Sequence, residues 1–321
     1  MEYRSLLSIA DLTDGEVDAL LDSAARFLPR IEQGGFKDST LRGTSVIMLF
    51  YEASTRTRVS FELAGKMLSS DTINVSAKGS SAEKGETLQD TAQTLAAMHH
   101  NVVVIRHPAA DAARVFKAHF PYAVINAGSG RGQHPTQALL DAFTLRRHGA
   151  FAAGKSLAVV GDITHSRVMR SNLQLLSRRG VDVTLVAPPT LMPEGWQGMA
   201  AGPGRLTWTT DIDGVLPQVD VVMMLRMQRE RMAGGLITNL DEYSKLYGLN
   251  RRRLALMRDD ALIMHPGPVN RGVEVSEDVF ADPRCRINDQ VTAGLALRCA
   301  LLCWACGKEP GSEPSAANAA I

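Results

Sequence analysis

The segment Ser-Thr-Arg-Thr-Arg at residues 54–58 places three hydroxyls and two guanidinium groups in five consecutive residues. It follows an apolar run typical of a strand, residues 46–50, and leads into Val59, Leu63 and Met67 at four-residue spacing, which predicts a helix. The hydroxyls therefore lie at a strand-to-helix turn, where first-turn N–H groups, the helix dipole and the arginines converge. This combination predicts a binding site for a phosphate dianion.

The same residues have a simpler structural interpretation. Ser54 is a suitable N-cap, helix caps of this type are common, and the two arginines could be solvated. The longer string favours a function, because Phe-Tyr-Glu-Ala followed by Ser-Thr-Arg-Thr-Arg resembles the phosphate-binding signature of the aspartate/ornithine carbamoyltransferase family. The resemblance implies that the phosphate of carbamoyl phosphate binds Ser54, Thr55, Arg56 and Thr57.

A second motif, His-Pro-Thr-Gln at residues 134–137, follows a predicted strand at 123–126 and a glycine-rich loop. Proline suits the first turn of a helix, so His134 and Gln137 lie at the same helix end. A lone histidine is more often a structural residue whose ring nitrogens are hydrogen-bonded within the protein. The four residues together match the family's second signature, which implies that His134 and Gln137 hold the carbamoyl group.

Arg106 directly follows a predicted strand at 102–105. Functional side chains of parallel sheets gather at the carboxyl ends of strands, so Arg106 is well placed for a site, whereas Arg114 in a predicted helix is not. The resemblance implies that the carbonyl oxygen of carbamoyl phosphate faces Thr55, Arg106 and His134.

The segment 76–86 is polar and contains glycines, which is typical of a mobile loop. Its composition alone fits a solvated linker. In the family the matching loop reaches the active site of a neighbouring subunit, and Ser80 and Lys84 fall on its functional positions. The resemblance therefore implies that Ser80 binds carbamoyl phosphate, that Lys84 acts in catalysis and in aspartate binding, and that the chain forms a homotrimer.

A second α/β series begins with a predicted strand at Ser156, after a hinge at 151–154. The glycine that follows this strand lacks the three-glycine dinucleotide fingerprint, so neither a nicotinamide nor a flavin cofactor is expected. Arg167 opens the next predicted helix. It matches the family position that binds the α-carboxylate of aspartate.

Arg226 and Gln228 follow a predicted strand at 219–225. These residues belong to a basic segment that could simply be the charged, solvent-facing side of a helix. Their place after a strand and their match to the Arg-x-Gln-x-Glu-Arg pattern of the aspartate enzymes imply that Arg226 and Gln228 bind the side-chain carboxylate of aspartate. The triple arginine at 251–253 is interpreted as a solvated face.

A further candidate is the loop His-Pro-Gly-Pro at residues 265–268, after a predicted strand at 261–264. Its two prolines exclude a helix and hold backbone carbonyls outward. In the family this loop makes backbone contacts to the carbamoyl amino group, which places them at Gly267 and Pro268. Some relatives carry leucine at the position of Gly267.

Strands that alternate with helices along the whole chain predict an α/β fold with two doubly wound parallel-sheet domains. The resemblance implies that residues 1–150 bind carbamoyl phosphate and that residues 151–288 bind aspartate. The active site is expected in the cleft between the domains, and the resemblance places it also at a subunit interface. The resemblance further implies that a helix at 289–306 packs back on the first domain, whereas composition predicts a disordered tail at 307–321.

Composition excludes several classes of protein. The 321-residue chain has a net charge of +1 and scattered arginines, so a nucleic-acid partner is not expected. Its first residues resemble neither a signal nor a transit peptide, and its most apolar late segment, 295–306, is too short to cross a bilayer. We expect a cytoplasmic protein without membrane association.

Three of the four cysteines, Cys299, Cys303 and Cys306, share one predicted helix face. Neither a histidine nor a fourth thiol nearby completes a tetrahedral site, so they are predicted to be core residues. No metal and no cofactor are expected.

The resemblance implies one reaction. The α-amine of aspartate attacks the carbonyl carbon of carbamoyl phosphate and phosphate leaves, which is the committed step of de novo pyrimidine synthesis. The expected catalytic residues are Thr55, Arg56, Arg106, His134 and Lys84. They act by positioning and by charge, with His134 as a hydrogen-bond donor and not as a base.

Two other functions remain open at this point. An ornithine enzyme of the same family would carry a Ser-Met-Gly segment and a His-Cys-Leu-Pro loop, where this chain has Arg226-x-Gln228 and His-Pro-Gly-Pro. Arg226 would also repel a cationic ornithine. A catalytically silent scaffold would bind without turnover. A regulatory chain or a dihydroorotase-like partner is a further possibility that the sequence does not decide.

Overall fold

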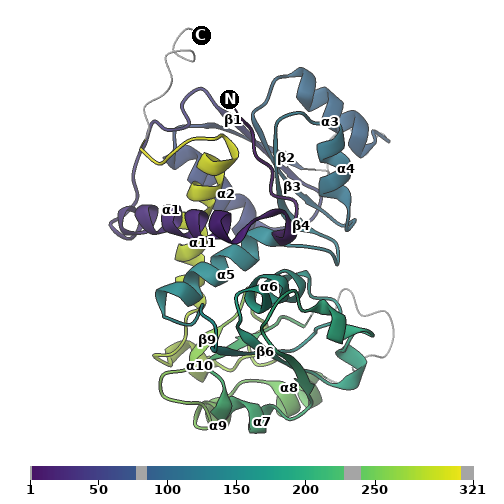
Figure 1. Cartoon of the computed structure of the whole chain (residues 1–321), viewed down its shortest axis with the longest axis vertical. Coiled ribbons are helices and arrows are strands. Elements are labelled where there is room, and N and C mark those ends of the chain that lie inside the picture. The colour runs from purple at the N-terminus through teal and green to yellow at the C-terminus, as the bar shows by residue number, and fades with distance from the viewer. Residues whose placement is uncertain (1, 77–84, 228–239, 312–321) are drawn as a thin grey trace. The chain divides into compact units, whose positions relative to one another are not determined.

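The computed structural model describes residues 2–76, 85–227 and 240–311 of the chain; Figure 1 draws the other residues as a grey trace. Strands and helices alternate along the described residues, and the strands form two sheets in which every pair of neighbours is parallel. This arrangement confirms the predicted α/β class with two parallel sheets.

The chain divides into two compact units. Unit 1 comprises Met1–Leu140 with Thr292–Ile321, and unit 2 comprises Asp141–Val291. Two helices, α5 (Pro135–Arg147) and α11 (Ile287–Ala305), contain residues of both units.

The sheet of unit 1 has the strand order β2-β1-β3-β4. Its strands are β1 (Ser45–Phe50), β2 (Asp71–Ser76), β3 (Val102–His107) and β4 (Ala123–Ser129). The inner strands β1 and β3 are almost wholly buried, as their unbroken apolar sequence predicts for a parallel sheet covered on both faces. The edge strand β2 is more exposed.

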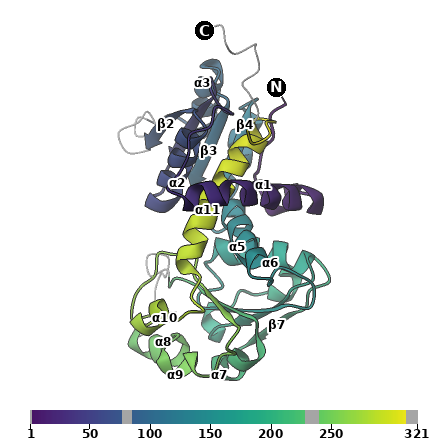
Figure 2. The ribbon, with the colours of Figure 1, turned by 90° about the vertical axis from the view of Figure 1, so that its left-hand side faces the viewer.

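Helices cover both faces of this sheet. They are α1 (Asp14–Glu32), α2 (Thr55–Met67), α3 (Leu88–Ala97) and α4 (Ala112–Ala118), preceded by the short helix η1 (Ile9–Asp11). Alternate residues of β1 and β3 pack with Ala92 of α3 and with Ala113 and Phe116 of α4. In Figure 2, α1, α2 and the unit 1 part of α11 lie in front of the same sheet. The predicted strands and helices of this unit are confirmed.

The sheet of unit 2 has the order β7-β6-β5-β8-β9. Its strands are β5 (Ser156–Val160), β6 (Asp182–Val186), β7 (Leu206–Thr209), β8 (Val221–Met224) and β9 (Leu262–Met264). The helices of this unit are α6 (Arg167–Arg178), α7 (Ile212–Val215), α8 (Leu240–Tyr247), α9 (Arg251–Leu254) and α10 (Glu277–Ala281), with short turns η3 (Pro189–Leu191), η4 (Trp196–Met199) and η5 (Leu216–Gln218).

The strand β7 lies in the segment between β6 and β8, whose prolines and glycines favour a loop. β7 has only four residues and lies at the edge of the sheet, where partial exposure removes the need for an apolar run. Parallel pairing with β6 defines it, and Trp208 also donates its indole N–H to the carbonyl of Ala187, just after β6 (3.1 Å).

The triple arginine at 251–253 is also not simply a solvated face. Arg253 is buried, with 3% of its surface exposed, and its guanidinium donates to Asp213 (2.7 Å) and to the carbonyls of Leu246 and Gly248 (2.6 Å each). The prediction was wrong for Arg253, because the acid that pairs with it, Asp213, is 40 residues away in the sequence.

The first residues of the predicted tail, 307–311, make defined hydrogen bonds with unit 1. Gly307 and Lys308 donate backbone hydrogen bonds to the end of α11, and the N–H of Gly311 donates to the Thr40 hydroxyl (3.1 Å). Residues 312–321 lie outside the described part of the chain.

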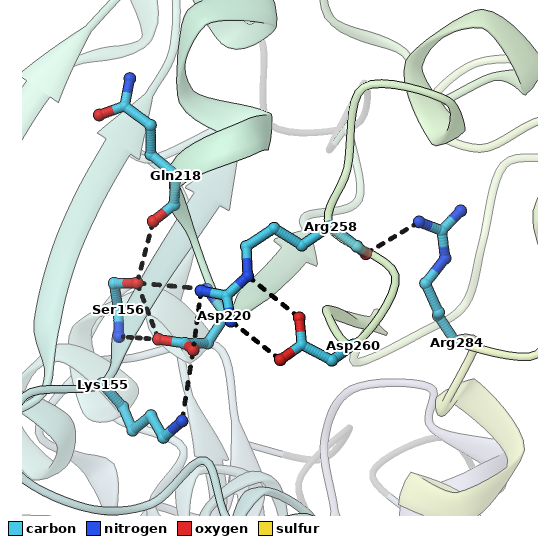
Figure 3. Close-up of polar contacts among 7 residues, drawn as sticks. All are labelled: Lys155, Ser156, Gln218, Asp220, Arg258, Asp260 and Arg284. Carbon is cyan, nitrogen blue, oxygen red and sulfur yellow. Dashed lines mark hydrogen bonds and ion pairs between the residues drawn. The ribbon is translucent and has the colours of Figure 1, made fainter.

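A polar cluster joins the amino ends of β5 and β8 (Figure 3). The carboxylate of Asp220 accepts hydrogen bonds from the N–H (2.8 Å) and hydroxyl (2.9 Å) of Ser156, and Lys155 and Arg258 each approach its other oxygen to 3.3 Å. Burial alone would raise the pKa of Asp220, but the hydrogen bonds from Ser156 and the charge of Lys155 hold this pKa below its ordinary value. The ionised carboxylate therefore stabilises unit 2.

We expect Asp220→Asn to lower the free energy of unfolding by about 1–3 kcal/mol at pH 7, because charge-assisted hydrogen bonds are lost. A carboxyl whose pKa is lower in the folded state stabilises above its unfolded pKa, and this stabilisation disappears as pH falls through the folded value. Urea unfolding at pH 7 and near pH 3 checks this: the difference between variant and wild type shrinks in acid. An equal difference at both pH values would contradict the account.

No helix formed by the described residues is long and apolar enough to span a membrane.

Candidate active site

The candidate residues of unit 1 follow three neighbouring strands. β1, β3 and β4 are adjacent and parallel, and Phe50 at the end of β1 pairs with Arg106 on β3. The chain then leaves β1 with Tyr51, whose N–H donates to the carbonyl of Arg106 (2.8 Å). Because the strands are parallel, the segment 54–57, Arg106 and the segment 134–137 all lie beyond the same edge of the sheet, as predicted.

The first signature forms the amino end of α2. The helix begins at Thr55, and Ser54 occupies the N-cap with an extended backbone, but the Ser54 hydroxyl makes no capping hydrogen bond. Ser54 is therefore the N-cap by position, as the sequence suggested, but without the side-chain hydrogen bond of a typical cap. Thr55 and Arg56 are exposed, so the turn offers hydroxyl, guanidinium and backbone N–H donors to an anion.

Arg106 is held by the first signature itself. Its Nε lies 3.3 Å from Oε2 of Glu52, with the two side chains only 15% and 19% exposed, and its Nη1 donates to the carbonyl of Ala127 (3.4 Å). Such an ion pair restricts the guanidinium to a narrow range of positions. Sequence reasoning gave Glu52 no role; its only signal was its place inside the signature string.

His134 and Gln137 are both buried where α5 begins. Nδ1 of His134 lies 3.4 Å from the hydroxyl of Thr136, and the N–H of Gln137 donates to the carbonyl of His134 (3.0 Å). The loop before them requires a glycine at Gly130, where φ is +44° and a Cβ would lie 2.3 Å from the carbonyl oxygen of Pro108. The glycine-rich loop thus fixes how the chain enters the second signature.

The candidate residues of unit 2 show the same arrangement on a second sheet. β5, β8 and β9 are adjacent and parallel. Arg167 follows β5, Arg226 follows β8, and the loop at 265–268 follows β9. These three segments therefore lie beyond one edge of the unit 2 sheet.

Arg167 is the first residue of α6 and is buried. Ser166 caps this helix by accepting the N–H of Met169 (3.1 Å). Just before the cap, Nδ1 of the buried His165 lies 2.9 Å from Oδ1 of the buried Asp162. This pair fixes the turn between β5 and α6, and sequence reasoning assigned it no role.

The loop at 265–268 is fixed by a chain of buried hydrogen bonds. The N–H of His265 donates to Oε1 of Gln290 (2.9 Å), whose Nε2 donates to Oδ1 of Asp141 (2.7 Å). The N–H of Gly267 donates to Nδ1 of His265 (2.8 Å), so this nitrogen is the acceptor of the ring. The backbone of Gly267 therefore has a defined orientation.

Three of the predicted residues, Ser80, Lys84 and Gln228, lie outside the described residues.

Within the described ranges, no group of three or more His, Cys, Asp and Glu residues is placed to hold a metal ion. Cys299 and Cys303 are buried on α11 and Cys306 is buried directly after its end, as predicted for core residues. Burial raises the pKa of Cys299 to about 12, so this thiol stays protonated at neutral pH.

Two family domains match the chain in sequence. The carbamoyl-P binding domain of the aspartate/ornithine carbamoyltransferases matches residues 4–147, and their Asp/Orn binding domain matches residues 153–305. The chain belongs to the aspartate/ornithine carbamoyltransferase family.

Individual relatives in this family are similar over nearly the whole chain. The aspartate carbamoyltransferase catalytic subunit of Desulforudis audaxviator is 50% identical over 302 residues, which are 94% of this chain and 97% of that subunit. The corresponding subunit of Acidothermus cellulolyticus is 49% identical over 317 residues, 99% of this chain and 96% of that subunit.

Solved structures agree with this family membership. Aspartate transcarbamoylase from Trypanosoma cruzi, in complex with carbamoyl phosphate and aspartate, superposes with a TM-score of 0.86 at 32% identity, covering 94% of this chain and 96% of that chain. The same enzyme in complex with N-(phosphonacetyl)-L-aspartic acid gives a TM-score of 0.84 at 31% identity, covering 94% of this chain and 95% of that chain.

Proposed function

We propose that this chain transfers the carbamoyl group of carbamoyl phosphate to the α-amine of L-aspartate. The products are N-carbamoyl-L-aspartate and phosphate, and the reaction is the committed step of de novo pyrimidine synthesis. The choice of aspartate as the acceptor rests on Arg226, which follows the carboxyl end of β8. A cation at this position attracts the side-chain carboxylate of aspartate and repels the side-chain ammonium of ornithine.

Carbamoyl phosphate is assigned to residues 1–150. Its phosphate binds the amino end of α2 through Ser54, Thr55, Arg56 and Thr57, and a neighbouring subunit adds Ser80 and Lys84. Its carbonyl oxygen receives hydrogen bonds from Thr55, Arg106 and His134. Gln137 helps to hold the carbamoyl group, whose amino group contacts the backbone of Gly267 and Pro268. The converging strand ends of β1, β3 and β4 support the first part of this assignment.

Aspartate is assigned to residues 151–288. Arg167 binds its α-carboxylate, Arg226 and Gln228 bind its side-chain carboxylate, and Lys84 of a neighbour contacts it as well. The positions of Arg167 and Arg226 after adjacent strands support this assignment. Two fixed cations also suit a dicarboxylate better than a monocarboxylate.

The chemistry needs no covalent intermediate with the protein. The neutral α-amine forms a bond to the carbonyl carbon, an oxyanion develops, and the bond from carbon to the phosphate oxygen breaks. The amine proton passes to the departing phosphate. Holding the two substrates in register supplies about 7–11 kcal/mol of the barrier reduction. Each donor aimed at the oxyanion adds about 3 kcal/mol.

The proposal includes a homotrimer in which the 77–84 segment serves a neighbouring site. Apolar side chains are exposed on α2 and on β2, the strand that ends at Ser76: Val59 (54%) and Leu63 (41%) on α2, and Ile73 (41%) on β2. Asn74 donates to Glu62 (2.8 Å), so β2 and α2 form one continuous surface. Exposed apolar groups on neighbouring elements suit a contact between subunits.

A cytoplasmic location is part of the proposal. All four cysteines, including the three buried ones on and directly after α11, are free thiols, which fits a reducing compartment.

The experiment that tests the proposed function is release of phosphate from carbamoyl phosphate by the purified chain. We expect release to require aspartate and to be absent with ornithine. Tight binding of carbamoyl phosphate without release under either condition would favour a silent scaffold, and release with ornithine would show that the acceptor residues were misassigned.

A further inference from the structure

Glu274 is a carboxylate in unit 2 with no exposed surface, and the reaction as proposed does not use it. It follows the loop at 265–268 by six residues, in the segment between β9 and α10. Burying a carboxylate away from water is costly unless several hydrogen bonds compensate. A buried acid in this place therefore needs an explanation.

Three N–H groups supply that compensation. Oε1 of Glu274 accepts from the backbone N–H of Met227 (2.6 Å) and from Nδ2 of Asn270 (2.7 Å). Oε2 accepts from the backbone N–H of Asn270 (2.8 Å). The side chain thus joins the residue directly after Arg226 to the segment that leaves the 265–268 loop.

Other contacts keep this junction rigid. Asn270 also donates from Nδ2 to the carbonyl of Met227 (3.4 Å), and the carbonyl of Glu274 accepts from the N–H of Leu249 (2.8 Å). Met227 itself is fully buried. Burial raises the pKa of Glu274 even though its hydrogen bonds act in the opposite direction.

We propose that Glu274 is a positioning residue for the acceptor substrate: it clamps the backbone at Met227 and so fixes the Arg226 guanidinium that binds the side-chain carboxylate of aspartate. The inference rests on the proposed function. In this role Glu274 influences the binding of aspartate although it contacts neither substrate. Glu274 acts only through the chain segments it joins.

The variant Glu274→Gln tests the clamp with almost no change in volume. An amide has one acceptor oxygen and one NH2 group, so either orientation of Gln turns an NH2 donor toward at least one of the three N–H groups. We expect the KM for aspartate to rise about tenfold, because a buried donor loses its partner. We expect kcat to change less than about threefold and the Kd of carbamoyl phosphate to stay the same.

Asp220→Asn is the matched control. Asp220 is also a carboxylate of unit 2 that accepts backbone and side-chain hydrogen bonds, but it lies at the amino end of β8, whereas Glu274 holds the chain beyond its carboxyl end. We expect Asp220→Asn to lower the melting temperature and to leave the KM for aspartate within about twofold of wild type. Comparing the two variants therefore distinguishes a loss of protein stability from a loss of correct positioning of Arg226.

Asn270→Ala provides a second variant if Glu274→Gln does not fold. It removes one of the three hydrogen bonds to Glu274 and keeps the other two, so we expect a smaller rise in the KM for aspartate, about two- to fivefold.

An unchanged KM for aspartate in a folded Glu274→Gln protein, or an equal rise in Asp220→Asn, would overturn the inference and leave the proposed function intact. Wild-type protein that releases no phosphate with aspartate would overturn both.

Discussion

Arg106→Met is expected to lower kcat by about 10²–10³-fold, which is the usual loss when one donor to a developing oxyanion is removed. The guanidinium of Arg106 is held by Glu52 at 3.3 Å and extends from the carboxyl end of β3. Methionine keeps the length and volume of the side chain but donates no hydrogen bond. Steady-state rates at saturating aspartate and carbamoyl phosphate measure the effect.

The control for this variant is Arg114→Met. Arg114 lies on α4 and pairs with Asp11 at 3.1 Å, with 61% of its side chain exposed. Surface ion pairs of this kind contribute about 0–1 kcal/mol, so the control should keep both its kcat and its stability. If Arg106→Met kept a kcat within threefold of wild type, Arg106 would not face the reacting carbonyl.

His134→Asn is expected to lower kcat by about 10²-fold while the pH dependence of kcat keeps its shape. The reason is that His134 is proposed to donate a hydrogen bond to the carbonyl oxygen, and asparagine donates from a similar place at poorer geometry. A residue acting as general base would instead carry an ionisation that the pH profile reports.

The measurement is kcat as a function of pH for the wild type and for His134→Asn. His148→Asn serves as a control, since His148 lies after the end of α5 and pairs with Asp289 at 3.3 Å, away from the second signature. Disappearance of one limb of the pH profile in His134→Asn alone would assign the base role to this histidine and contradict the donor role.

The strand ends that carry the candidate residues could be predicted from sequence because the signal is local. The strands β1, β5, β8 and β9 contain buried apolar runs, and so do the first four residues of β3 and the first three of β4. Parallel strands then bring whatever follows them to one edge. The apolar runs alone therefore suffice to place Arg106, Arg167 and Arg226 at the edges of their sheets.

The contacts that fix those residues could not be predicted, since their partners are distant in sequence. Glu274 meets Met227 across 47 residues, and Asp141 meets Gln290 across 149. Nothing in the neighbouring sequence distinguishes such a buried acid from a solvated one. The same reason explains the error at Arg253, whose partner Asp213 is 40 residues away.

The strand β7 and the orientation of the Ser54 hydroxyl could not be predicted, for different reasons. β7 is short and partly exposed, so pairing with β6 defines it more than its composition does. Ser54 has the residue type and position of an N-cap, but residue type cannot show whether the hydroxyl turns toward the helix.

The most direct test of the account is a competition between the two acceptors of the family. Carbamoyl phosphate labelled with ¹³C at its carbonyl is mixed with the purified chain and equal concentrations of aspartate and ornithine, and the labelled product is followed by NMR. The account predicts that the label enters N-carbamoyl-L-aspartate, with no detectable label on ornithine, because Arg226 repels the cationic acceptor. Label on the side-chain amine of ornithine would contradict it.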